Sequence, residues 1–262
     1  MNFILSLLLF SSWVSAAESG PLRTFAGHSA AVETIGFSQD GQYLASSGLD
    51  TNVILWVVKT GKLKKIMVGH TESVWGLDFS PDGDYLASLG NKAMEVWKVP
   101  GGKNFKSIPG QSYSMYTVKF SPDGDYLAAG GYGTVDIWTF PDGDRYRTLK
   151  APVEGVNSLA FYSGGNRMVS GNGDGSVVLW HVDESRVLRT IKAHQGAVRA
   201  VAVTPDSAYA VSGGLDGDVK VWRLSDGVMV SSVTAHEGGV RAVAVSPNGK
   251  YIASGGMDNL AR

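Results

Sequence analysis

Histidine, serine and aspartate recur along this chain in a combination that nucleophilic catalysis uses. His28, Ser46 and Asp50 form the first such set. In a hydrolytic triad a histidine activates the serine and an acid orients the histidine, so these residue types fit that chemistry. The interval from His to Ser is 18 residues in four places: His28 to Ser46, His70 to Ser88, His194 to Ser212 and His236 to Ser254.

The repetition argues against catalysis. A catalytic constellation appears once in an active site, whereas these residues return at fixed offsets. We therefore predict a structural role for every set. We expect no catalytic residue among them and no enzymatic activity in the chain.

The sets belong to an internal repeat. Trp56, Trp97, Trp138, Trp180 and Trp222 follow one another at intervals of 41, 41, 42 and 42 residues. In most copies a Gly-His or Ala-His pair, an apolar run, a turn such as FSPDG and a YLAS-like run precede the Trp. Short apolar runs bounded by turn residues are typical of β-strands joined by tight turns. Each repeat is predicted to be a four-stranded antiparallel sheet, with VETIGF, YLASS, NVILWVV and KLKKIMV as the strands of the first.

These anchors and their spacing resemble the WD40 repeat family, and the resemblance covers the chain from about Leu22 to Arg262. It implies an all-β WD40 β-propeller, in which sheets that are apolar on both faces are buried by radial stacking. One departure is that the Trp-Asp pair that names the family never occurs. The residues that follow the five tryptophans are Val57, Lys98, Thr139, His181 and Arg223.

The resemblance also implies that the His, Ser, Asp and Trp of a repeat form one buried hydrogen-bonded chain. The middle of the sequence departs from this pattern, with Asn91 in an Asp position, Gln111, Ala129 and Tyr132 in the third repeat, and Pro152 in the fourth His position. The expected members are His28, Ser46, Asp50, Trp56, His70, Ser88, Trp97, Ser170, Asp174, Trp180, His194, Ser212, Asp216, Trp222, His236, Ser254 and Asp258.

Five complete blades and a partial sixth are expected at 27–68, 69–109, 110–150, 151–192, 193–234 and 235–262. Residues 21–26 are predicted to be an outer strand without a blade of its own. In this family such a strand clasps the last blade and closes the ring. The next Trp would fall at about position 264, so the ring is incomplete in this sequence. Either Leu22 to Phe25 pairs beside a short third strand and closes a strained six-bladed ring, or the sequence is part of a longer protein with a seventh blade. Propellers typically carry whole blades, so we favour the second interpretation.

Composition excludes several functions. The chain has 23 basic and 24 acidic side chains with no long run of either sign, so no nucleic-acid partner is expected. It has no cysteine, which excludes disulfides, thiolate metal sites and c-type haem attachment within it. His181 is the only His outside the repeat positions, and a lone imidazole seldom binds a metal. We expect no cofactor and no metal.

The N-terminus predicts export. An apolar block from Phe3 to Phe10 precedes small residues that suit signal-peptidase cleavage after Ala16 or Ala17. Residues 1–17 are therefore predicted to be a signal peptide and residues 18–262 the propeller, periplasmic or secreted, without membrane insertion after cleavage. The block lacks a basic residue before it, so an uncleaved anchor, a buried segment and a cytoplasmic protein stay open as alternatives.

The predicted function is binding of a protein or peptide at the top rim of the propeller. The residue five positions after each His position lies near the start of the first strand, where this family often contacts partners. Aromatic residues and arginines are favoured there as interface anchors, although packing between blades is an alternative role. The alternative function is the propeller portion of a larger exported enzyme or c-type cytochrome fusion. The candidate rim residues are Glu33, Trp75, Tyr116, Asn157, Arg199 and Arg241.

Overall fold

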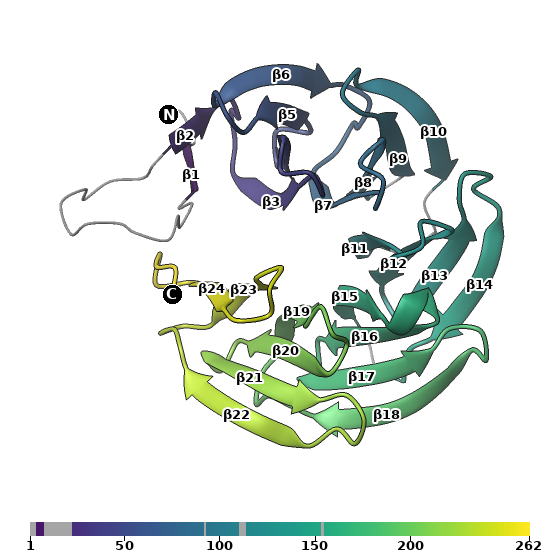
Figure 1. The fold of residues 1–262 in the computed structure, drawn as a ribbon, viewed down its shortest axis with the longest axis vertical. Helices are drawn as coiled ribbons and strands as arrows, with labels where there is room; N and C mark the ends of the chain where they lie inside the picture. Colours follow the sequence, from purple (N-terminus) through teal and green to yellow (C-terminus); the bar gives the residue numbers. More distant parts are fainter. Residues whose placement is uncertain (1–3, 8–22, 92, 110–113, 153–154) are drawn as a thin grey trace. The chain divides into compact units, whose positions relative to one another are not determined.

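The computed structural model describes residues 4–7, 23–91, 93–109, 114–152 and 155–262 (Figure 1). These residues form β-strands and turns, with one 3-10 turn, η1 (Ser163–Gly165). The all-β prediction is confirmed. No helix among the described residues is both long enough and apolar enough to cross a membrane.

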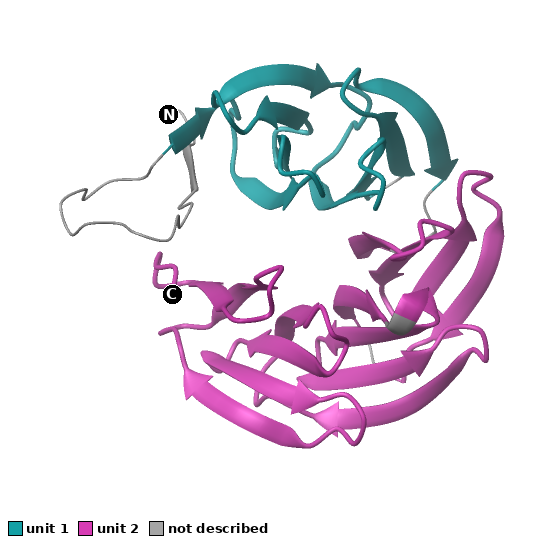
Figure 2. Cartoon of the chain, in the orientation of Figure 1, with its two compact units in different colours: residues 1–111 teal, residues 112–262 magenta. Residues whose placement is uncertain are grey.

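The chain divides into two compact units, residues 1–111 and residues 112–262 (Figure 2). Unit 1 contains blades one and two, and unit 2 contains blades three to six. Each complete blade is an antiparallel sheet of four strands in chain order, and blade six has two strands. The five complete blades and the partial sixth therefore agree with the prediction.

The strands of unit 1 are β1 (Ile4–Leu7), β2 (Arg23–Ala26), β3 (Val32–Phe37), β4 (Tyr43–Gly48), β5 (Val53–Val57), β6 (Lys62–Met67), β7 (Val74–Phe79), β8 (Tyr85–Gly90), β9 (Ala93–Lys98) and β10 (Lys103–Pro109). Blade one is β3 to β6 and blade two is β7 to β10.

The strands of unit 2 are β11 (Met115–Phe120), β12 (Tyr126–Gly131), β13 (Thr134–Thr139), β14 (Arg145–Lys150), β15 (Val156–Tyr162), β16 (Arg167–Asn172), β17 (Ser176–His181), β18 (Arg186–Lys192), β19 (Val198–Val203), β20 (Tyr209–Gly214), β21 (Asp218–Arg223), β22 (Met229–Thr234), β23 (Val240–Val245) and β24 (Ile252–Gly256). They form blades three, four and five in groups of four, and β23 with β24 forms blade six.

We call the first strand of each blade its inner strand and the fourth its outer strand. In unit 2 the first residue of an inner strand packs tightly against the neighbouring blade. Val198 of blade five packs against Gly171 of blade four so closely that a Cβ at position 171 would lie 2.5 Å from the Val198 Cγ1 atom. Val156 meets Gly130 in the same way. Real Cβ atoms do not approach other atoms so closely, so glycine at these positions is required by the packing between blades.

The repeated tryptophans are core residues. Their exposed fractions are 1% for Trp56, 2% for Trp97, 4% for Trp138, 1% for Trp180 and 6% for Trp222. An apolar residue from an outer strand covers several of these rings. Phe25 of β2, for example, lies edge-on to Trp56 with the ring centroids 5.7 Å apart. Burying large rings on both faces of each sheet supplies much of the hydrophobic stabilisation of the blades.

Strand β2 lies within the predicted orphan segment 21–26. It pairs in antiparallel register with β1, from Leu7 opposite Arg23 to Ile4 opposite Ala26. Strand β1 falls inside the segment that we predict to be a signal peptide, most of which lies outside the described residues. Cleavage of that peptide and closure of a ring by β2 both stay predictions.

Candidate functional site

The His, Ser, Asp and Trp of blade one meet inside the sheet. The Trp56 indole N–H donates to the Ser46 hydroxyl oxygen at 2.8 Å, and Ser46 Oγ lies 2.7 Å from His28 Nε2. His28 Nδ1 lies 2.9 Å from each Asp50 carboxylate oxygen. The Asp50 carboxylate also accepts the backbone N–H of Ser29 at 2.9 Å.

Blade five repeats this arrangement. Trp222 donates to Ser212 at 2.8 Å, Ser212 Oγ lies 2.7 Å from His194 Nε2, and His194 Nδ1 lies 2.8 Å from Asp216 Oδ1. Indole is a donor only, so the serine accepts from it and can donate its own proton to Nε2. The remaining imidazole proton is then on Nδ1, where it is donated to the carboxylate.

The contacts of each imidazole match those of a hydrolytic triad, yet no substrate can use them. Ser46 and Ser212 have no exposed surface. Their hydroxyl oxygens already accept a tryptophan N–H, whereas a nucleophile needs a free lone pair facing the substrate carbonyl. The same geometry therefore gives a closed structural network, which we call the tetrad.

Burial sets the charge state of the tetrad in blade five. Loss of solvation lowers the pKa of His194, and the hydrogen bond to Asp216 only partly opposes this. Burial by itself raises the pKa of Asp216, but hydrogen bonds from His194 and from the Gln195 N–H outweigh it and leave the pKa lowered. A neutral imidazole therefore faces a carboxylate.

Blades two and six hold parts of the tetrad. In blade two, Trp97 donates to Ser88 at 2.8 Å, and Ser88 Oγ lies 2.7 Å from His70 Nε2. Burial lowers the pKa of His70, where no Asp is available at the position of Asn91. In blade six, His236 contacts Ser254 and Asp258, each at 2.8 Å.

Arg262 joins the tetrad residues of blade six. Its guanidinium donates to Asp258 Oδ2 at 2.6 Å and also lies 2.7 Å from His236 Nδ1. The hydrogen bond from Arg262 holds the pKa of Asp258 far below its usual range. The start of a third strand is present here, because Ala261 forms a β-bridge with Gly255.

Blade four corrects one prediction. Trp180 donates to Ser170 at 2.9 Å as expected, but Asp174 accepts from the N–H and hydroxyl of Ser176 at 3.0 and 2.6 Å. Asp174 therefore caps its own turn and does not extend the chain from Ser170 and Trp180. The reason is that Pro152 stands where blades one, two, five and six carry the connecting imidazole.

Asn172 fills part of the space that the imidazole occupies in blades with a His. The equivalent position is glycine in blades two, five and six, and a Cβ there would lie 2.7, 2.4 and 2.3 Å from the local imidazole, at Gly90, Gly214 and Gly256 respectively. Asn172 is fully buried and donates to Ser176. A side chain at this position is compatible with the fold because blade four has no His.

The six candidate rim residues share one backbone feature. Each is the second residue of an inner strand and falls in the register shift of that strand against its neighbour, as between Val198 and Ala200. They are bulge residues without a cross-strand partner, a geometry that turns a side chain out of the sheet. The shifts enclose Glu33, Trp75, Tyr116, Asn157, Arg199 and Arg241.

The rim residues differ in their surroundings. Arg199 and Arg241 are exposed on β19 and β23, which are neighbouring inner strands of unit 2. Tyr116 on β11 is 37% exposed. Asn157 is half-buried and donates to the Val198 carbonyl at 2.9 Å, so it bridges blades four and five. Glu33 is exposed and Trp75 is half-buried, both in unit 1.

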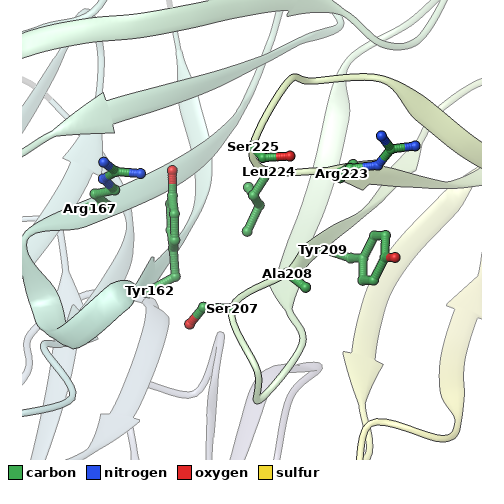
Figure 3. Close-up of a pocket in the computed structure, with 8 residues that line it drawn as sticks. All are labelled: Tyr162, Arg167, Ser207, Ala208, Tyr209, Arg223, Leu224 and Ser225. Atoms are coloured by element: carbon green, nitrogen blue, oxygen red, sulfur yellow. The ribbon is translucent and has the colours of Figure 1, made fainter.

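A pocket of about 290 Å³ lies at the opposite end of the inner strands in unit 2 (Figure 3). Blade four contributes Tyr162 and Arg167, and blade five contributes the rest of the lining. Sequence reasoning missed this site. The signal that could have revealed it is that Tyr162 and Arg167 depart from the residue types at the same positions of the other repeats. The lining residues are Tyr162, Arg167, Ser207, Ala208, Tyr209, Arg223, Leu224 and Ser225.

No group of three or more His, Cys, Asp or Glu side chains is placed to bind a metal ion in the part of the chain that the structure describes.

The chain matches the family model described as WD domain, G-beta repeat, six times. The matched residues are 19–57, 61–98, 102–139, 143–181, 185–223 and 227–262. The first five matches end in the third strand of a blade, and the sixth ends at Arg262, where a third strand begins. The first match includes β2. Because these matches cover most of the sequence, the chain belongs to the WD40 repeat family.

Proposed function

We propose that this protein is a non-catalytic platform that binds a protein or peptide partner through the bulge residues of its inner strands. Members of the WD40 family generally serve as scaffolds for protein interactions. The buried serines of the tetrads give no support to a hydrolytic alternative. Proteins that display varied side chains on a rigid repeated scaffold are suited to recognition, because the scaffold holds those side chains in place.

The observation that carries the proposal is the coincidence of bulge, exposure and residue type. Arg199, Arg241 and Tyr116 are exposed on equivalent bulges, while the flanking residues Val198 and Val240 are buried between blades. Arg and Tyr are enriched among the residues that dominate binding energy at interfaces. The bulge orients them outward, and the buried residue beside each of them, a valine in β19 and β23 and Met115 in β11, anchors the strand.

A matched pair of photo-crosslinking variants tests this proposal. A benzophenone amino acid would replace Tyr116 on the inner strand β11 or Tyr146 on the outer strand β14 of the same blade, since both side chains are 37% exposed. We expect irradiation in cells to give discrete crosslinked partners from position 116 and few or none from position 146. Equal crosslinking from both positions would contradict a binding surface at the rim.

Export is part of the same proposal and rests on the N-terminal sequence. If residues 1–17 are a cleaved signal peptide, mass spectrometry of the protein purified from its native host will give a mature N-terminus at Ala17 or Glu18. Recovery of the intact N-terminus would contradict cleavage.

A further inference from the structure

The pocket between blades four and five is built where both blades depart from the repeat. In the other blades the inner strand is followed by Ser or Thr, and a Tyr comes five residues later. The hydroxyl of that residue typically binds an Asp two positions on, as Ser80 does to Asp82 at 2.5 Å, and accepts the N–H of the Tyr, as from Tyr85 at 2.9 Å. These bonds hold the turn in one conformation.

Blade four has Tyr162 and Arg167 at these two positions. Tyr162 is only 4% exposed, and its phenol points between the Arg167 guanidinium and the turn that carries Leu224 and Ser225 (Figure 3). Burial raises the pKa of Tyr162, with a hydrogen bond from Arg167 opposing this in part, so the phenol keeps its proton at neutral pH.

Blade five departs from the repeat on the facing side. Ser207 adopts a φ of 58° in a turn position where all the other blades carry glycine. The next residue is Ala208, at the position of Asp84 in blade two and Asp125 in blade three. The small side chain leaves room in the pocket and removes a carboxylate from it.

The polar side chains around the pocket are all potential donors. They are the guanidiniums of Arg167 and Arg223, the phenols of Tyr162 and Tyr209, and the hydroxyls of Ser207 and Ser225. None of the eight lining residues is acidic.

Acidic residues lie close by, outside the lining. Asp206 is engaged within its own turn, where its carboxylate accepts the Thr204 hydroxyl at 2.5 Å and the Ala208 N–H at 3.0 Å. Asp226 pairs with Arg223 at 2.9 Å, and Glu184, which pairs with Arg186, also feels the charge of Arg167. Arg167 therefore supplies most of the positive charge that is available to a ligand.

We propose that this pocket binds a small organic oxyanion, a molecule that ends in a carboxylate or a phosphate group. Arg167 and the Tyr162 hydroxyl hold the anionic oxygens, because charge-assisted hydrogen bonds from a guanidinium are strong and directional. The Tyr162 ring and Leu224 contact the apolar part of the ligand. A volume of about 290 Å³ suits a ligand of metabolite size.

The site is separate from the rim, because Asn157 and Tyr162 lie at opposite ends of β15. Its occupancy can therefore be tested independently of partner binding. Isothermal titration of the purified protein with phenyl phosphate, benzoate and inorganic phosphate separates a phosphate site from a carboxylate site. We expect saturable one-to-one binding of phenyl phosphate or benzoate, with inorganic phosphate weaker.

Three variants assign the binding to the pocket. Arg167→Tyr restores the residue of the other blades and is expected to weaken binding by at least about tenfold. Tyr162→Phe removes one hydroxyl and is expected to weaken it by about threefold to tenfold. Lys192→Gln, which removes an exposed cation at the far end of β18 outside the pocket, should bind as the wild type does. Absence of saturable binding by all three probes, or equal affinity of folded Arg167→Tyr and wild type, would overturn the proposal.

Discussion

Blades four and five have the same four-stranded fold but differ in the side-chain hydrogen bonds inside the sheet. Blade five has the full tetrad, in which Ser212 joins an indole to an imidazole. Blade four keeps only the bond from Trp180 to Ser170 and fills space near the missing imidazole with Asn172. Because blade four forms without the imidazole, buried indoles and interlocking valines suffice for a blade. We predict that the complete tetrad adds stability to blade five.

Removing the tetrad serine should have the largest effect. Ser212→Ala leaves the indole N–H of Trp222 without its acceptor and the His194 imidazole without its partner, so we expect a loss of about 2 to 3 kcal/mol. Ser170→Ala in blade four breaks one such bond and should cost about 1 kcal/mol. Urea unfolding followed by tryptophan fluorescence measures both. Equal losses would mean that the imidazole adds nothing to the tetrad.

Restoring the imidazole in blade four tests whether residue 172 occupies its place. Pro152→His alone forces an imidazole against Asn172, and Asn172→Gly alone leaves unfilled space and loses the bonds to Ser176. The double variant gives the imidazole its room. We expect it to be more stable than the sum of the single changes predicts, by about 1 to 2 kcal/mol in a double-mutant cycle. Strict additivity would show that residue 172 does not occupy the imidazole's space.

Acid should weaken the tetrads in two steps. Burial lowers the pKa of His70 and His194 below the ordinary value of 6.5, so the unfolded chain takes up protons at a higher pH than the folded chain does. Their contribution to stability is complete above about pH 6.5 and declines as the pH falls below it. Hydrogen bonds from His194 and the Gln195 N–H lower the pKa of Asp216 from 3.8 despite its burial, so a further loss follows below that pH.

Urea unfolding at a series of pH values checks this order. His194→Gln should remove part of the loss that begins near pH 6.5, while Ser212→Ala at neutral pH should remain the larger single effect. Stability that is flat between pH 7 and pH 5 would contradict a neutral buried imidazole in these blades.

The smallest predicted effect is a gain in stability. Ser207 adopts a left-handed backbone conformation that glycine occupies without strain. Ser207→Gly should therefore stabilise blade five by about 0.5 to 1 kcal/mol, less the entropy that glycine loses on folding. Differential scanning calorimetry of the two proteins measures the change. Destabilisation would indicate that contacts of the serine side chain outweigh the backbone strain.

Much of the fold was predictable because the same residue pattern recurs in each repeat. Trp56 and Trp222 lie in blades far apart in the sequence and make the same bond. The recurring spacing, together with the apolar runs and turn residues around each Trp, therefore located the strands. The role of Asp174 was predicted wrongly, because the residue type was retained while its partner had become Pro152. The aspartate then serves the local turn, which an i to i+2 hydrogen bond makes favourable in any blade.

The candidate sites were predictable only in part. The positions of Arg199 and Arg241 followed from counting after the histidine, but the bulge that leaves them without a cross-strand partner is a property of the strand register. The pocket is lined by Tyr162 of one blade and Ala208 of the next, an arrangement across two repeats that no periodicity within a repeat can reveal.

The central claim is that repeated residues hold the blades and that variable residues on the bulges bind the partner. The most direct measurement is the affinity of a crosslinked partner for Arg199→Ala/Arg241→Ala, compared with Arg186→Ala/Arg189→Ala on the outer strand β18. We predict a loss of at least about tenfold for the first pair and wild-type affinity for the second, with unchanged unfolding midpoints in both. Wild-type affinity in the Arg199→Ala/Arg241→Ala protein would contradict the claim.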